Sequence, residues 1–197
     1  MNPLSKLIFE LSKLPGIGEK SATRLAYYIL NQDASYSESL ASALRDAKSK
    51  LRYCKECFNF SESELCEICV DPKRDSLQIC VVERPSDVTP IERTGTYKGS
   101  YHVLHGLLSP MDGIGPEDIK MRELFLRLKE KEVTEVIFAL NPSVEGEATG
   151  LYLSRLLKPV GIRLSQVAYG IPFGGTIEFT DRQTLGKALE NRTEMQK

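Results

Sequence analysis

Four of the five cysteines in this 197-residue chain fall within sixteen residues, as the pairs Cys54-x-x-Cys57 and Cys66-x-x-Cys69. Two such pairs allow four thiolates to surround one ion tetrahedrally, and Zn²⁺ is the usual occupant of a closed, all-sulfur site. Disulfides are the alternative, and the lack of a signal-peptide pattern disfavours them. Because four protein ligands leave no open position, we expect one structural zinc ion per chain, held in a zinc ribbon over residues 54–76.

The remaining composition is that of an ordinary soluble globular protein, with 41% hydrophobic and 27% charged residues. No stretch approaches the roughly 18 apolar residues that cross a bilayer. The apolar start of the chain contains Lys6, Glu10 and Lys13, unlike a signal peptide. We therefore expect a cytoplasmic protein with no membrane segment. The fifth cysteine, Cys80, lies in an apolar run, which favours a small buried hydrophobic side chain.

Residues 1–53 show the periodicity of three amphipathic helices. Asn2-Pro3 is a typical helix start, and the first apolar stripe ends near Leu14. Pro15-Gly16-Ile17-Gly18 then breaks the pattern, and a second stripe runs from Ala22 to Leu30. After a polar link, a third helix is expected over about 39–53. The region is predicted to be a helix-hairpin-helix.

The hairpin carries a candidate phosphate-binding site, formed by Gly16, Gly18, Lys20 and Arg24. The glycines let backbone amides approach a phosphate, and the start of the second helix adds a partial positive charge. Lys20 and Arg24 are four residues apart, so they share a helix face. Residues 1–53 hold eight Lys and Arg against five Asp and Glu, a net charge of +3 in a chain of net charge −1. The alternative is a plain helix connection with two solvated cations.

From residue 77 onward, short apolar strands alternate with helical patterns, which predicts βα units and a mostly parallel sheet over residues 77–168. Residues 169–180 are predicted to be a structured loop, and a short helix follows within a C-terminal segment, 169–197. The fold class is thus a multi-module α+β and α/β chain. The expected strands are 77–83, 101–104, 135–140 and 163–168, and the expected helices are 86–93, 116–131, 147–157 and 181–191.

Three carboxylates, Glu83, Glu145 and Glu147, fall at or just past the predicted strand ends. Ligands of open α/β sheets bind at this edge, and clustered carboxylates there are able to hold Mg²⁺ for phosphoryl transfer. The alternative is that they are loop residues at a helix start, where an acidic side chain favours the helix dipole. The residues alone leave both interpretations open.

Several blocks of the sequence, in this order, resemble the bacterial recombination mediator family RecR over essentially the whole chain. The resemblance implies a helix-hairpin-helix, a four-cysteine zinc module and a Toprim-like domain. One departure is His105, where the family usually has glycine. The blocks are LPGIGEKSATR at 14–24, the two cysteine pairs, VERPSD at 82–87, YHVLHGLLSP at 101–110, DGIGP at 112–116, NPSVEGE at 141–147, GIPFGG at 170–175 and TLGKAL at 184–189.

The resemblance also implies a function. Metal-dependent Toprim enzymes have Asp-x-Asp-x-x-Gly where this chain has Asn141-x-Ser143-x-x-Gly146, so RecR-like proteins bind DNA rather than cut it. With RecO and RecF they help to load RecA onto single-stranded gaps coated with SSB. The resemblance further implies a homotetrameric ring that encircles DNA, with subunit contacts made by the helix-hairpin-helix region and the C-terminal segment, 169–197. It also implies a cytoplasmic protein that is associated with the nucleoid during repair. The acidic surface with Glu83, Glu145 and Glu147 would then face RecO.

The competing hypothesis is a Mg²⁺-dependent Toprim nuclease or a primase-like enzyme that uses Glu83, Glu145 and Glu147. The neutral Asn141 and Ser143 disfavour it. Nucleotide hydrolysis is disfavoured further, because the chain contains no GxxxxGK[ST] phosphate-binding loop. The sequence therefore predicts a DNA-binding protein without catalytic residues.

Overall fold

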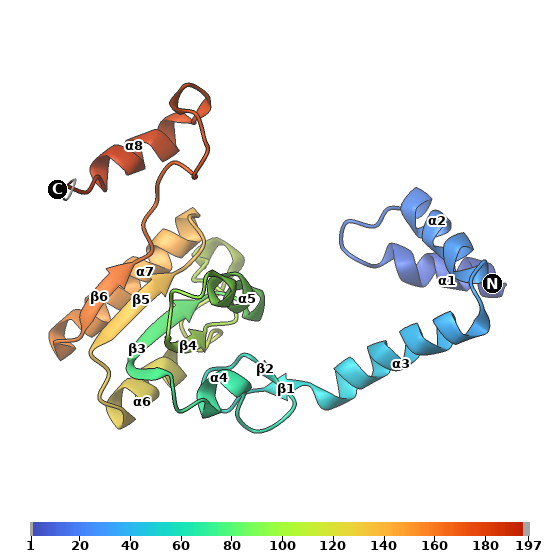
Figure 1. The fold of residues 1–197 in the computed structure, drawn as a ribbon, viewed down its shortest axis with the longest axis horizontal. Helices are drawn as coiled ribbons and strands as arrows, with labels where there is room; N and C mark the ends of the chain where they lie inside the picture. The colour runs from blue at the N-terminus through green and yellow to red at the C-terminus, as the bar shows by residue number, and fades with distance from the viewer. Residues whose placement is uncertain (1, 195–197) are drawn as a thin grey trace. The chain divides into compact units, whose positions relative to one another are not determined.

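Two compact units, divided after Leu51, make up the chain (Figure 1). The computed structural model describes residues 2–194. Met1 of the predicted region 1–53 and residues 195–197 of the predicted region 169–197 lie outside the described residues. None of the described helices has the length and apolar character that crossing a membrane requires.

Three helices form the first unit: α1 (Pro3–Ser12), α2 (Glu19–Leu30) and α3 (Ala34–Lys50). The side chain of Asn2 accepts a hydrogen bond from the amide of Ser5 at 2.7 Å and caps α1, as the Asn-Pro start predicted. Helices α1 and α2 pack on each other and are joined by the hairpin. The predicted helix-hairpin-helix arrangement is confirmed.

The third helix begins earlier and ends earlier than the apolar pattern predicted. Asp33, assigned to a polar link, instead caps α3, and its carboxylate accepts from the amide of Tyr36 at 3.1 Å. The helix stops at Lys50 because Arg52 and Tyr53 form a short strand. Strand pairing with a later segment thus ends the helix, which a local periodicity does not reveal.

The second unit opens with a small hairpin around the cysteines. Strand β1 (Arg52–Tyr53) pairs antiparallel with β2 (Phe60–Ser61), and the one-turn helix α4 (Glu67–Val70) follows. The rings of Tyr53 and Phe60 stack across the pair, with centroids 5.3 Å apart. The turn of this hairpin holds the first cysteine pair, whereas Cys66 is the N-cap of α4 and Cys69 lies within that helix.

A four-stranded sheet in the order β4-β3-β5-β6 forms the centre of the second unit (Figure 1). All three strand pairings are parallel, which confirms the predicted sheet. Each crossover between strands includes a helix, as parallel pairing requires. The elements are β3 (Asp75–Val82), α5 (Pro85–Thr94), β4 (Gly99–Val103), α6 (Met121–Glu130), β5 (Glu135–Ala139), α7 (Val144–Leu157) and β6 (Arg163–Gln166).

The central strand β3 is apolar on both faces because both faces are covered. Ile79 and Val81 belong to the core cluster that includes side chains of α6 and α7. Cys80 and Val82 belong to the opposite cluster, which packs against α5 and the cysteine hairpin. The prediction that Cys80 is a buried hydrophobe is confirmed, and burial raises the pKa of its thiol to about 12.

The C-terminal segment carries the short helix α8 (Arg182–Glu190), close to its predicted bounds. The carboxylate of Asp181 caps it by accepting from the amides of Gln183 and Thr184. Helix α6 is shorter than the predicted 116–131, because the preceding residues form turns in which the amide of Lys120 bonds the carbonyl of Leu104 at 2.8 Å.

Candidate metal centre, nucleic-acid interface and strand-end cavity

The four paired cysteines converge in space, with their sulfur atoms all within 4.8 Å of one another. Cys54, Cys57 and Cys66 are buried, and Cys69 is half-buried. Two of the sulfurs accept hydrogen bonds from backbone amides. The amide of Cys66 donates to the sulfur of Cys54 at 3.3 Å, and the amide of Asn59 donates to the sulfur of Cys57 at 3.5 Å. The hairpin and α4 thus form two knuckles that face each other and stabilise thiolates.

This donor set fits a tetrahedral zinc ion. Sulfur atoms about 2.3 Å from such an ion lie about 3.8 Å apart, and the sulfurs of Cys57 and Cys66 are 3.5 Å apart. That separation is far longer than a disulfide bond of about 2.05 Å. Hydrogen bonds among the crowded sulfurs raise the pKa of Cys57 and Cys69 and lower that of Cys66, so the thiols share protons, and a cation would favour the loss of those protons.

A buried ion pair ties the first cysteine knuckle to the α/β domain. Glu56, between the cysteines of the first pair, accepts from a guanidinium nitrogen of Arg127 at 2.7 Å and also contacts Lys131. Arg127 is 6% exposed, and its other terminal nitrogen bonds the carbonyl of Tyr101 in β4. The knuckle therefore supplies the counter-charge for a cation in the interior of the domain.

His105 makes a second connection between the hairpin and the domain. Its backbone φ of +60° is the left-handed conformation that favours glycine, the residue usual there in the family that the sequence resembles. Its ring nitrogen Nε2 hydrogen-bonds the carbonyl of Phe58 at 2.8 Å, and its ring lies 4.3 Å from that of Tyr53. The loop keeps the glycine-type backbone while the imidazole adds contacts to the hairpin.

The helix hairpin presents open backbone amides beside two cations. Gly16 has a φ of +78°, which glycine adopts without strain, and Gly18 is the N-cap of α2 with no side-chain cap. The first amides of α2 are therefore left for an external acceptor. Lys20 and Arg24 are exposed, and neither forms a salt bridge with any residue from 2 to 194. Gly16, Gly18 and Lys20 thus lie at the start of α2, and Arg24 lies about one turn further along the same helix.

Glu83 lies at the end of β3 and is buried, where its two carboxylate oxygens have different partners. Asn141 donates its side-chain amide to one oxygen at 2.6 Å, and the Arg84 guanidinium donates to the other at 2.8 Å. Ser143 caps α7 by accepting from the amide of Gly146 at 3.1 Å. The two neutral residues of the Asn-x-Ser run therefore serve as a hydrogen-bond donor and a helix cap.

A cavity of about 660 Å³ opens at these strand ends, and Glu83 and Glu145 line it. Asp112 also lines it and accepts from the Ser109 hydroxyl at 2.5 Å. Asp112 belongs to the block at 112–116, which follows no predicted strand directly, so its position in the sequence does not predict a site residue. Its loop reaches the cavity only through the tertiary fold.

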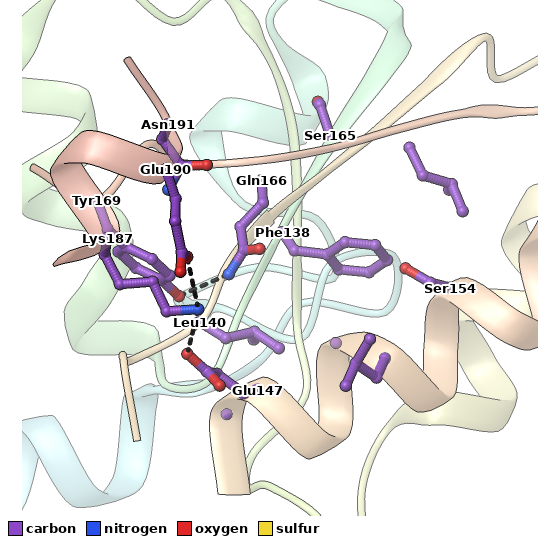
Figure 2. A pocket seen from close by; sticks show the side chains of 14 residues that line it. Phe138, Leu140, Glu147, Ser154, Ser165, Gln166, Tyr169, Lys187, Glu190 and Asn191 are labelled. Carbon is purple, nitrogen blue, oxygen red and sulfur yellow. Dashed lines mark hydrogen bonds and ion pairs between the residues drawn. The ribbon is translucent and has the colours of Figure 1, made fainter. Parts of the chain in front are cut away.

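Glu147 lies apart from this cavity. It lines a separate cavity of about 390 Å³ between α7, β6 and α8, where its carboxylate is 3.7 Å from the ammonium of Lys187 (Figure 2). Figure 2 shows Lys187 between Glu147 and Glu190. Among the residues that the structure describes, the cysteines form the one group of three or more potential metal ligands. The structure therefore does not gather the three predicted carboxylates into one site.

Comparisons with known proteins match all four parts of the chain. Residues 4–48 match the family described as "RecR, helix-hairpin-helix", and residues 51–71 match the four-cysteine zinc finger domain of RecR. Residues 78–168 match "Toprim domain", and residues 170–193 match "RecR, C-terminal". A protein named "Recombination protein RecR", from Myxococcus xanthus (strain DK1622), is 50% identical over 194 residues, which cover 98% of each chain.

Proposed function

Because the chain belongs to the RecR family of recombination proteins, we propose that it is a DNA-binding mediator of recombinational repair without catalytic activity of its own. The observation that carries this proposal is the start of α2, where uncapped amides lie beside the exposed Lys20 and Arg24. Phosphate contacts of this kind position a nucleic acid without reading its sequence.

The strand-end cavity supports binding rather than cleavage. A metal-dependent phosphoryl-transfer site holds its ion with carboxylate oxygens that are free to coordinate it, and here Asn141 turns an amide donor toward Glu83. An N–H group in that position repels a cation. The Arg84 guanidinium adds a positive charge on the other oxygen of Glu83. We infer that Glu83 has a structural or partner-binding role.

Membership of the RecR family also supports a proposal for the partner proteins of this chain. We propose that the chain works with RecO and RecF to load RecA onto gapped DNA coated with SSB, and that it forms a homotetrameric ring around DNA. A ring would present several copies of the Lys20 and Arg24 pair, which raises affinity by avidity. The acidic cavity of Glu83, Glu145 and Asp112 is the candidate surface for RecO. Glu147 is a poorer candidate for this surface, because its carboxylate lies beside Lys187 in a separate cavity.

We propose that the ion in the cysteine site is a single structural Zn²⁺. Cys54, Cys57, Cys66 and Cys69 would supply all four ligands, so no position remains for water or substrate. The ion would neutralise clustered thiolates and hold the hairpin, and with it Glu56, against the domain.

The test is a binding and cleavage assay of zinc-loaded protein with end-labelled gapped DNA in the presence of Mg²⁺. We expect retarded but intact DNA. The double variant Lys20→Ala and Arg24→Ala should lose binding and show a shallower salt dependence. The matched control is Arg45→Ala with Lys48→Ala, two exposed cations on α3. Unchanged affinity in the first variant would remove these residues from the proposal.

Cleavage of the DNA that is lost in Glu83→Gln would show an active Toprim nuclease and refute the non-enzymatic assignment. Partner binding is tested separately, by the affinity of purified RecO for the wild type and for Glu83→Gln with Glu145→Gln. Equal affinities would remove the acidic cavity from the RecO surface.

A further inference from the structure

Helix α2 carries an exposed tyrosine, Tyr27, on the side away from its buried residues. Tyr27 is 52% exposed, although a tyrosine ring is a large apolar surface. The side of α2 that packs in the unit is marked by Ala22 and Ala26, both fully buried, and by the half-buried Leu25 and Ile29. Tyr27 lies on the other side, with Lys20 and Arg24.

The helical geometry makes this arrangement quantitative. Successive residues of a helix are rotated by about 100° around its axis. The mean direction of the four packed side chains is therefore about 170° from the direction midway between Lys20 and Arg24. Tyr27 lies about 40° from that midpoint, so it belongs to the solvent-facing stripe with both cations. Along the axis, Arg24 is about 6 Å beyond Lys20, and Tyr27 is about 4.5 Å beyond Arg24. Two cations and an aromatic ring thus follow one another along one exposed line.

The neighbouring Tyr28 has the same exposure, at 53%, but a different environment. Its ring packs edge-on against that of Tyr36 in α3, with centroids 6.0 Å apart. No aromatic pair within residues 2–194 includes Tyr27. Tyr28 therefore contributes to the packing of its own unit, whereas Tyr27 is half-exposed and has no aromatic partner among the described residues.

We infer that Tyr27 is a stacking platform for an unpaired base of single-stranded DNA whose phosphates are held by Lys20 and Arg24. This inference rests on the proposed function. Aromatic rings stack on bases of any sequence, while neighbouring cations follow the backbone. In a duplex both faces of each base are covered by neighbouring base pairs. The tyrosine thus provides a preference for single strands that phosphate contacts alone do not give.

The chain contains no tryptophan, so Tyr27→Trp introduces a single, specific fluorescence signal. We expect its emission to be quenched by an oligo(dT) strand and not by a strand of the same length built from abasic sites. Equal quenching by both strands would overturn the inference, because an abasic strand keeps the phosphates and offers no base to stack.

Affinity measurements provide the second readout, on full-length zinc-loaded protein. Tyr27→Ala should lower affinity for oligo(dT) about 5-fold or more and leave duplex affinity unchanged, since stacking contributes at least about 1 kcal/mol per base. Tyr27→Phe should retain wild-type affinity, and Tyr28→Ala is the matched control that should do the same. An equal loss on single strands and duplex in Tyr27→Ala would overturn the inference.

Two other outcomes distinguish a failure of the stacking inference from a failure of the proposed function on which it rests. If the Lys20 and Arg24 double variant binds normally, the phosphate site itself fails. If that variant loses binding while Tyr27→Ala still prefers single strands as the wild type does, only the stacking inference fails. A changed sedimentation coefficient in Tyr27→Ala, with equal losses on both DNA forms, would instead assign Tyr27 to a contact with a second copy of the chain.

Discussion

The ion pair between Glu56 and Arg127 gives the sharpest prediction for stability. Removing one partner of a buried pair typically costs about 3 to 5 kcal/mol, because the other charge stays buried. Glu56 is 21% exposed, and Arg127 keeps its bond to the Tyr101 carbonyl. We therefore expect Glu56→Ala to lower the free energy of unfolding by about 2 to 3 kcal/mol. For a domain of this size, that loss lowers the melting temperature by about 5 to 10 °C.

The assay is thermal unfolding of the zinc-loaded protein, followed by circular dichroism. Glu62→Ala is the matched control, because Glu62 is an exposed acid in the same hairpin region. Adding Arg127→Met to Glu56→Ala should recover stability, since the unpaired buried charge is then removed. If the double variant is no more stable than Glu56→Ala, or if Glu56→Ala melts with the control, the buried-charge argument is refuted.

Three further predictions concern the zinc site, a buried histidine and the hairpin. Cys66→Ser should lower both the bound zinc and the melting temperature, and equal melting temperatures with and without a chelator would contradict a structural ion. Burial lowers the pKa of His102 to about 4, below its unfolded value of 6.5. Between these two pH values the unfolded chain binds more protons than the folded chain, so the protein loses stability as the pH falls through that window. Urea unfolding should show the wild type losing about 1 kcal/mol between pH 7 and 5.5 that His102→Gln does not lose. Gly16→Ala should cost about 1 kcal/mol because of its positive φ, whereas Gly18→Ser, at an N-cap with free space around it, should stabilise α2; the same urea series tests both.

Local chemistry made much of the molecule predictable. The cysteine spacing predicted the metal centre, because each Cys-x-x-Cys pair closes its own knuckle within a few residues. Gly16 and Gly18 predicted the hairpin, because the backbone freedom of glycine is a property of the residue itself. Short apolar strands that alternate with helical patterns predicted a parallel sheet, because each parallel crossover needs a long connection, usually a helix.

Boundaries were less predictable where a side chain or a distant strand decided them. Asp33 begins α3 because its carboxylate reaches the amide of Tyr36, although no apolar stripe marks this position. The end of the same helix is set by the pairing of Arg52 with Ser61. Periodicity reports which face of a helix is buried, but it is silent about the partner that stops it.

The order of strands and the direction of helices decided which side chains meet. Glu56 and Arg127 are 71 residues apart, and His105 and Phe58 are 47 apart, so no local pattern joins them. The direction of α7 separated Glu147 from the cavity of Glu83 and Glu145, because residues two positions apart on a helix point to different sides. The sequence by itself determined the main helices and strands and the four cysteines that could hold a metal ion. Only the tertiary structure decided the long-range charge pairs and the membership of the strand-end cavity, since these depend on distances that folding creates.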